Sequence, residues 1–197
     1  MKHRGARTMS EFNTVGEKQL GYSCAEVDDF FAALADDFEL LRSGGSRQDV
    51  ATSTLIRQRS FSGQAGGYVP QEVDAALDRV EDRFVVFEKE RVIAREEISA
   101  WNARLESDAE LIMGRLNRPE RQRFRRPSEK LTRGYFVGDV DALCESLKAH
   151  FLSDEELSPA MIREAVFSSA TGEISYEETQ VDAFLDRCVS LILAIKA

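Results

Sequence analysis

The sequence predicts an all-α fold made of repeated units, each with a short helix, a turn containing glycine and tyrosine, and a longer amphipathic helix. Three observations support this fold class. One short motif occurs four times in the 197 residues, and apolar residues recur at helical spacing after each copy. In addition, the stretch from Gln71 to Met113 contains neither glycine nor proline, which predicts a long central helix resembling a coiled coil.

Each copy of the motif places a tyrosine five residues before a Val-Asp pair. Repeated supersecondary units bury their apolar faces against one another, so we expect the copies to pack together. An aspartate at the same turn of every helix is favourable near the positive helix end, which predicts a structural role for it. The motif residues are Gly21, Tyr22, Val27 and Asp28; Gly67, Tyr68, Val73 and Asp74; Gly134, Tyr135, Val140 and Asp141; and Tyr176, Val181 and Asp182.

The helix that follows each motif is predicted to be amphipathic. Apolar residues follow steps of three and four over residues 27–41, 73–87, 140–151 and 181–192, which places them on one stripe of each helix. Glu26, Glu72, Asp139 and Gln180 stand in the first turns. There they predict capping boxes, in which the side chain accepts a hydrogen bond from the cap residue's own N–H.

A second element precedes the tyrosine. Copies two and four share a short helical pattern over residues 55–61 and 161–167, whereas copies one and three keep only Phe12 and Phe124 of it. We therefore predict a disordered or tag-like N-terminus over residues 1–9 and repeat units over residues 10–42, 50–114 and 157–197. Residues 115–152 are expected to hold a basic connector and the third copy.

The second unit's helix is predicted to continue far beyond its own stripe. An approximate heptad spacing extends from Val73 to Ile112, which predicts a coiled-coil seam within one chain or between two chains. A helix of roughly forty residues would be about 60 Å long, which exceeds the length of an ordinary globular helix.

The charge of the chain is acidic overall but unevenly distributed. The net charge of −9 argues against general nucleic-acid binding. The segment from Arg115 to Arg133 is nevertheless rich in basic residues, which indicates contact with an anionic membrane surface, a solvated linker, or charge partners for the protein's own acidic helices. The candidate contact residues are Arg118, Arg121, Arg123, Arg125, Arg126, Lys130 and Arg133.

Reactive constellations are scarce. The three cysteines form no CxxC motif, and the two histidines lie far apart in the sequence, which argues against metal sites and histidine-based triads. Cys144 and Cys188 fall on apolar helix faces and are predicted to be inert core thiols in a reducing cytosol. No glycine-rich turn ends in Gly-Lys-Ser/Thr. We predict no catalytic residue, cofactor, metal or small-molecule substrate.

Taken together, these units resemble the DivIVA domain of bacterial cell-division and polar-growth proteins. Leu157-Ser158-Pro159, Ile162-Arg163, Phe167, Tyr176 and Val181-Asp182 match its pattern in the fourth copy. Arg133-Gly134-Tyr135 and Glu26-Val27-Asp28 match parts of it in the third and first copies. Four degenerate copies in one chain are similar to a family of DivIVA-repeat proteins from actinobacteria.

The resemblance implies a non-enzymatic, all-helical cytoplasmic scaffold or adaptor at the division septum or cell pole. Such proteins self-associate through coiled coils and bind protein partners, and membrane contact would be peripheral. Members that bind membranes carry an aromatic residue and an arginine before Gly-Tyr, but here Gln19-Leu20 and Glu173-Ile174 stand there in the first and fourth copies. With four units in one chain, copies one and two, or two and four, can pair within a molecule, and pairing between chains remains the alternative.

Overall fold

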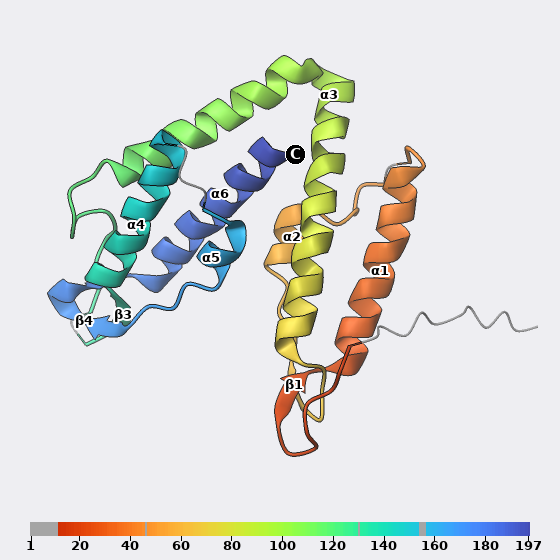
Figure 1. Ribbon diagram of the computed structural model, residues 1–197, viewed down its shortest axis with the longest axis horizontal. Coiled ribbons are helices and arrows are strands. Elements are labelled where there is room, and N and C mark those ends of the chain that lie inside the picture. The colour runs from red at the N-terminus through yellow and green to blue at the C-terminus, as the bar shows by residue number, and fades with distance from the viewer. Residues whose placement is uncertain (1–11, 46, 130, 154–156) are drawn as a thin grey trace, which may run out of the picture. The chain divides into compact units, whose positions relative to one another are not determined.

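A computed structural model describes residues 12–45, 47–129, 131–153 and 157–197 (Figure 1). The chain forms two compact units, Met1–Arg91 and Val92–Ala197, which we call the N-terminal and C-terminal units. The fold is mostly helical and has a long central helix, as predicted. The predicted tag-like segment, residues 1–9, lies outside the described residues.

The N-terminal unit contains two short strands, two helices and the first part of the central helix. These elements are β1 (Leu20–Tyr22), α1 (Cys24–Arg42), α2 (Ser53–Arg57), β2 (Gly63–Ala65) and α3 (Pro70–Leu116). Strands β1 and β2 pair in antiparallel register, with Gly21 opposite Gln64. The side chain of Thr52 caps α2 by accepting a hydrogen bond from the N–H of Leu55.

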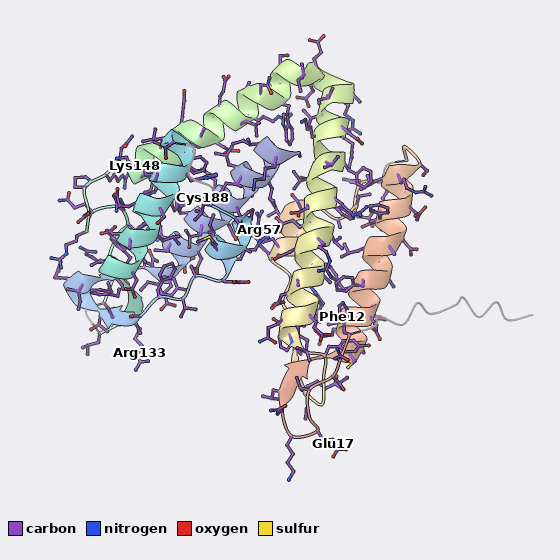
Figure 2. All side chains as sticks on the ribbon, in the orientation of Figure 1. Phe12, Glu17, Arg57, Arg133, Lys148 and Cys188 are labelled. Atoms are coloured by element: carbon purple, nitrogen blue, oxygen red, sulfur yellow. The ribbon has the colours of Figure 1, made fainter. Side chains whose placement is uncertain are left out.

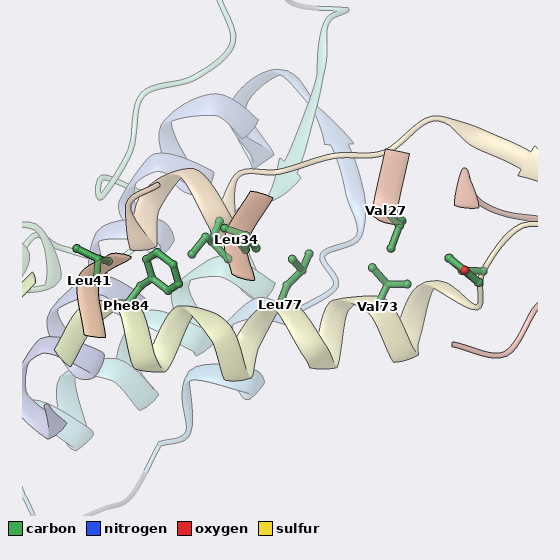
Figure 3. Packing of buried hydrophobic residues seen from close by; sticks show 8 residues of the cluster. Val27, Leu34, Leu41, Val73, Leu77 and Phe84 are labelled. Carbon is green, nitrogen blue, oxygen red and sulfur yellow. The ribbon is translucent and has the colours of Figure 1, made fainter. Parts of the chain in front are cut away.

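The core of this unit lies between α1 and the N-terminal part of α3. The apolar stripes of both helices contribute side chains to this core, and Figure 3 shows these side chains meeting in one cluster. Burial of each such aliphatic or aromatic side chain contributes roughly 1.5–3 kcal/mol, so the predicted stripes account for the pairing of the two helices. The labelled members are Val27, Leu34 and Leu41 on α1 and Val73, Leu77 and Phe84 on α3.

The C-terminal unit contains the rest of α3 and a second set of short strands and helices. The elements are β3 (Arg133–Phe136), α4 (Val137–Leu152), α5 (Pro159–Arg163), β4 (Ser169–Thr171), η1 (Gly172–Ile174), β5 (Ser175–Tyr176) and α6 (Glu178–Lys196). The strands form one antiparallel sheet in the order β4-β3-β5. The core of the unit includes Val140 and Leu147 on α4 and Val181 and Ile192 on α6, all fully or almost fully buried.

The prediction of a purely α-helical fold is wrong, because three of the motif tyrosines lie in short strands and Tyr68 forms isolated β-bridges. Tyr22 and Tyr68 each donate a backbone hydrogen bond of 2.9 Å to the carbonyl oxygen of the other. In the C-terminal unit Tyr135 lies opposite Tyr176. Strands of two to four residues are too short to show the alternation of apolar and polar residues by which a sequence indicates a strand.

The long central helix α3 is interrupted once along its length. Glu97 within α3 has φ 72° and ψ 165°, a non-helical conformation that is rare outside glycine. Beside this break, Arg104 pairs with Glu96 at 2.6 Å, although side chains eight residues apart do not meet on a regular helix. The predicted seam is divided accordingly: Val73 is buried in the N-terminal unit, Ile112 is buried in the C-terminal unit, and Ile98 between them is 48% exposed.

The burial predicted for two cysteines is confirmed. Cys144 and Cys188 are free thiols with no exposed surface, whereas Cys24 is half-buried. Burial raises the pKa of Cys144 to about 12 and raises that of Cys188 as well. Because the thiolate is the reactive form, we expect a thiol-alkylating reagent to modify only Cys24 in the native protein and all three cysteines after unfolding. Mass spectrometry of the alkylated chain measures this, and rapid labelling of Cys144 under native conditions would contradict it.

Candidate functional site

The motif tyrosines and aspartates bind each other across copies. In the N-terminal unit the hydroxyl of Tyr68 donates to Asp28 Oδ1 at 3.1 Å, and that of Tyr22 donates to Asp74 Oδ2 at 3.4 Å. The tyrosine of the second copy therefore contacts the aspartate of the first, and the reverse contact is also made. This exchange places both aspartates, which lie near the N-terminal ends of α1 and α3, at the contact between the two copies.

The C-terminal unit makes the same exchange in a more buried setting. The hydroxyl of Tyr176 donates to Asp141 Oδ1 at 3.1 Å, and Tyr135 forms a hydrogen bond with Asp182. Burial, together with the neighbouring carboxylates, raises the pKa of both tyrosines to about 12. Both hydroxyls therefore stay protonated at neutral pH and act as hydrogen-bond donors.

Glycine precedes the tyrosine in three copies because the backbones of the paired copies approach too closely to leave room for a side chain. A Cβ atom at Gly21 would lie 2.3 Å from the carbonyl oxygen of Tyr68, and one at Gly67 would lie 2.3 Å from that of Tyr22. At Gly134 the corresponding distance to the Tyr176 oxygen is 2.1 Å. The fourth copy has Ser175 at this position, where the hydroxyl is buried and donates to the carbonyl oxygen of Gly172 at 2.9 Å.

A phenylalanine from each upstream element packs on the tyrosine of the other copy. We call these upstream segments the arms; each is the stretch of chain around one phenylalanine, namely Phe12, Phe61, Phe124 or Phe167. In both units the arms cross from one copy to the other, and Figure 2 labels Phe12 on the first arm. The rings meet at tilted or edge-to-face angles, an arrangement that aromatic pairs prefer. The ring-centroid distances are 5.4 Å for Phe12–Tyr68, 5.4 Å for Phe61–Tyr22, 5.2 Å for Phe124–Tyr176 and 4.9 Å for Phe167–Tyr135.

The capping boxes expected in the first helical turns are absent from all four motif helices, which lie within the described residues. The acidic or amide side chain in each first turn instead accepts a hydrogen bond from the backbone N–H that follows the phenylalanine of the other copy's arm. The sequence indicated an acceptor correctly but not its donor, because the donor lies on a distant segment. The pairs are Ser62 N to Glu26 Oε2 (3.1 Å), Asn13 N to Glu72 Oε2 (2.8 Å), Ser168 N to Asp139 Oδ2 (2.7 Å) and Arg125 N to Gln180 Oε1 (2.9 Å).

These carboxylates make the stability of the pairing dependent on pH. The hydrogen bond from the Ser62 backbone holds the pKa of Glu26 below its usual value of 4.5. A pKa that is lower in the folded state adds stability above the unfolded value, and this contribution is lost as pH falls through the folded value. We expect Glu26→Gln, which keeps the acceptor as Gln180 does, to reduce the loss of stability below pH 4.5. Urea unfolding over an acidic pH series measures this, and an unchanged pH slope would contradict it.

Asp141 is the centre of a buried polar network in the C-terminal unit. Its carboxylate accepts the Tyr176 hydroxyl, receives the backbone N–H of Arg121 at 2.7 Å and pairs with the Arg123 guanidinium at 3.2 Å. The side chains of Arg123 and Asp141 are 3% and 8% exposed. Arg123 also pairs with Glu145, and its backbone N–H donates to the Tyr176 hydroxyl at 3.2 Å. Arg123 is therefore a structural residue of the C-terminal unit.

Several of the other predicted basic contact residues also bind within the C-terminal unit. Arg125 pairs with Glu177, and the Arg118 guanidinium donates to the Arg123 carbonyl at 3.4 Å. The Arg126 guanidinium donates to Ser175 O at 3.2 Å and lies 5.0 Å from the centroid of the Tyr176 ring. Arg121 and Arg133 are exposed, and Arg133 is labelled in Figure 2, while Lys130 lies outside the described residues.

The arrangement closes an interface between copies. In the described ranges, no cluster of three or more His, Cys, Asp or Glu side chains is placed to hold a metal ion. No helix in those ranges is both long enough and apolar enough to span a membrane. In comparisons with known proteins, no family model, no curated protein and no solved structure matches the chain.

Proposed function

We propose that the protein is a non-enzymatic scaffold or adaptor related to the DivIVA cell-division and polar-growth proteins. It acts through helix–helix contacts and protein partners. The observation that carries this proposal is the exchange of contacts within each unit, where Tyr68 binds Asp28 and Tyr176 binds Asp141. All the motif tyrosines and aspartates are used for pairing, so the motif has the role of an assembly contact.

In this proposal the chain contains four copies of one unit, which pair as one with two and as three with four. Each copy contributes a tyrosine and an arm to its partner and receives the partner's tyrosine and arm in return. The apolar stripes of α1 and α3 are buried against each other inside one chain. The protein is then an adaptor that presents surfaces to partners, because the stripes that would join two chains are already covered.

The cellular site of action in this proposal is the division septum or the cell pole. A fluorescent fusion expressed in an actinobacterium tests it, with Gly21→Ala as a variant that disrupts the pairing of the first two copies. We expect foci at septa or poles for the wild type and weaker foci for the variant at equal protein level. Uniform fluorescence of an intact wild-type fusion would contradict a role in division or polar growth.

The alternative function is peripheral binding to an anionic membrane through the basic segment Arg115–Arg133. The exposure of Arg121 and Arg133 supports it, whereas the internal contacts of Arg123 and Arg126 reduce the charge available to lipids. Co-sedimentation with vesicles of phosphatidylglycerol and of phosphatidylcholine at low salt tests this alternative. Pelleting only with the anionic vesicles, reduced by Arg133→Gln, would support it, and no pelleting at low salt would exclude it.

A further inference from the structure

A cleft of about 260 Å³ lies between α6 and the C-terminal part of α3 in the C-terminal unit. Its apolar walls include Ile112 and Phe184, which are 1% and 9% exposed. Leu111 also lines the cleft and is 56% exposed, so apolar surface continues outward from it. The polar side chains that line the cleft belong to Arg115, Gln180 and Arg187.

The cleft carries positive charge that is only partly compensated. The Arg115 guanidinium donates to the carbonyl oxygen of Arg123 at 2.8 Å and lies 5.2 Å from the centroid of the Phe124 ring. Within the part of the chain that the structure describes, no carboxylate forms an ion pair with Arg115. Arg187 has one distant carboxylate, Asp108 at 4.0 Å, and both side chains are about half exposed.

The residue at position 180 adds no negative charge to the cleft. The corresponding first-turn positions of the other three motif helices hold the carboxylates of Glu26, Glu72 and Asp139. Gln180 makes the equivalent hydrogen bond, accepting from the Arg125 N–H at 2.9 Å, without a negative charge. The one neutral residue among these four positions therefore lies in the cleft that two arginines line.

We propose that this cleft binds an acidic peptide segment of a protein partner, with a carboxylate between Arg115 and Arg187 and an adjacent aliphatic side chain against Ile112 and Phe184. Guanidinium groups bind carboxylates with paired, directional hydrogen bonds. The volume lies below the roughly 300–1,000 Å³ of small-molecule sites, and suits one or two side chains better than a cofactor. The inference rests on the proposed adaptor function and names the chemistry of its partner.

A labelled model peptide tests the proposal on the full chain. The probe is a fluorescein-labelled amphipathic peptide with glutamate and leucine at helical spacing, compared with the same peptide carrying glutamine for glutamate. Fluorescence anisotropy is expected to show tighter binding of the glutamate peptide. Gln180→Glu retains the acceptor for Arg125 but places a negative charge in the cleft. This charge repels the glutamates of the peptide and is expected to weaken binding roughly tenfold or more. Arg187→Gln, at a half-exposed position, is expected to weaken it as well.

Glu26→Gln provides the matched control. It replaces a carboxylate by an amide at the corresponding position of the N-terminal unit, the opposite of Gln180→Glu, and should leave peptide binding unchanged. Circular dichroism verifies the fold of each variant. The proposal is overturned if the wild type does not bind the glutamate peptide, if it binds both peptides equally, or if folded Gln180→Glu and Arg187→Gln bind as the wild type does. Binding to phosphatidylglycerol vesicles without binding to the peptide would overturn it too. If the protein is monomeric and localises to septa but does not bind the peptide, this inference alone is contradicted and the adaptor function remains in place.

Discussion

Replacement of Gly21 by alanine is expected to unfold much of the N-terminal unit. The new Cβ atom would lie 2.3 Å from the carbonyl oxygen of Tyr68 and 2.8 Å from the backbone of Gly67. These neighbours are main-chain atoms of the paired copy and cannot rotate away, so we expect a loss of about 3 kcal/mol or more in the free energy of unfolding. Urea unfolding followed by circular dichroism measures this loss.

The matched control is Gly114→Ala, since a Cβ atom there meets nothing within 4 Å. Gly114 lies inside helix α3, where alanine is favoured over glycine by roughly 0.5–1 kcal/mol, so this variant should be slightly more stable than the wild type. The single tryptophan, Trp101, lies in the C-terminal unit, and its fluorescence reports unfolding there. If Gly21→Ala unfolds at the same urea concentration as the wild type, the close approach of Gly21 to the Gly67-Tyr68 backbone is refuted.

Replacement of Arg123 by methionine is expected to have a comparable effect in the C-terminal unit. The variant keeps an apolar side chain of similar length but leaves the buried carboxylate of Asp141 without its cation. Removing one member of a buried ion pair costs about 3–5 kcal/mol, because the remaining charge stays desolvated. The transition seen by Trp101 fluorescence should therefore move to a lower urea concentration.

Arg125→Met is the control for this second prediction. Arg125 pairs with Glu177, but its side chain is 69% exposed, and an exposed ion pair contributes little to stability. The two variants remove the same charge from the same basic segment and differ in burial. If both substitutions lower the urea concentration of the transition by the same small amount, the segment is a solvated linker. That result would contradict a structural role for Arg123.

The sequence predicted the parts of the fold that depend on helical periodicity. The stripes of α1 and α3 contain residues such as Val27, Leu34, Val73 and Phe84, and these are the side chains that form the N-terminal core. The buried thiols of Cys144 and Cys188 followed from the same pattern. Stripe positions are local properties of the sequence, so a single sequence is enough to find them.

The contacts between copies were not predictable in the same way. Phe12 is ten residues before its tyrosine and Phe61 is seven residues before its own, so no fixed spacing indicates that each ring packs on the other copy's tyrosine. The break at Glu97 was not predictable either, because no glycine or proline lies near it in the sequence. Likewise, the burial of Arg123 depends on Asp141, which lies in the following helix, and a basic run alone looks solvated.

The mass of the chain in solution tests the central claim, that the copies pair within one molecule. Light scattering coupled to size-exclusion chromatography over a wide range of protein concentration measures it. Intramolecular pairing predicts one species of 22.2 kDa at every concentration. A dimer or larger assembly that persists on dilution would contradict the claim, because the stripes and arms would then be shared between chains.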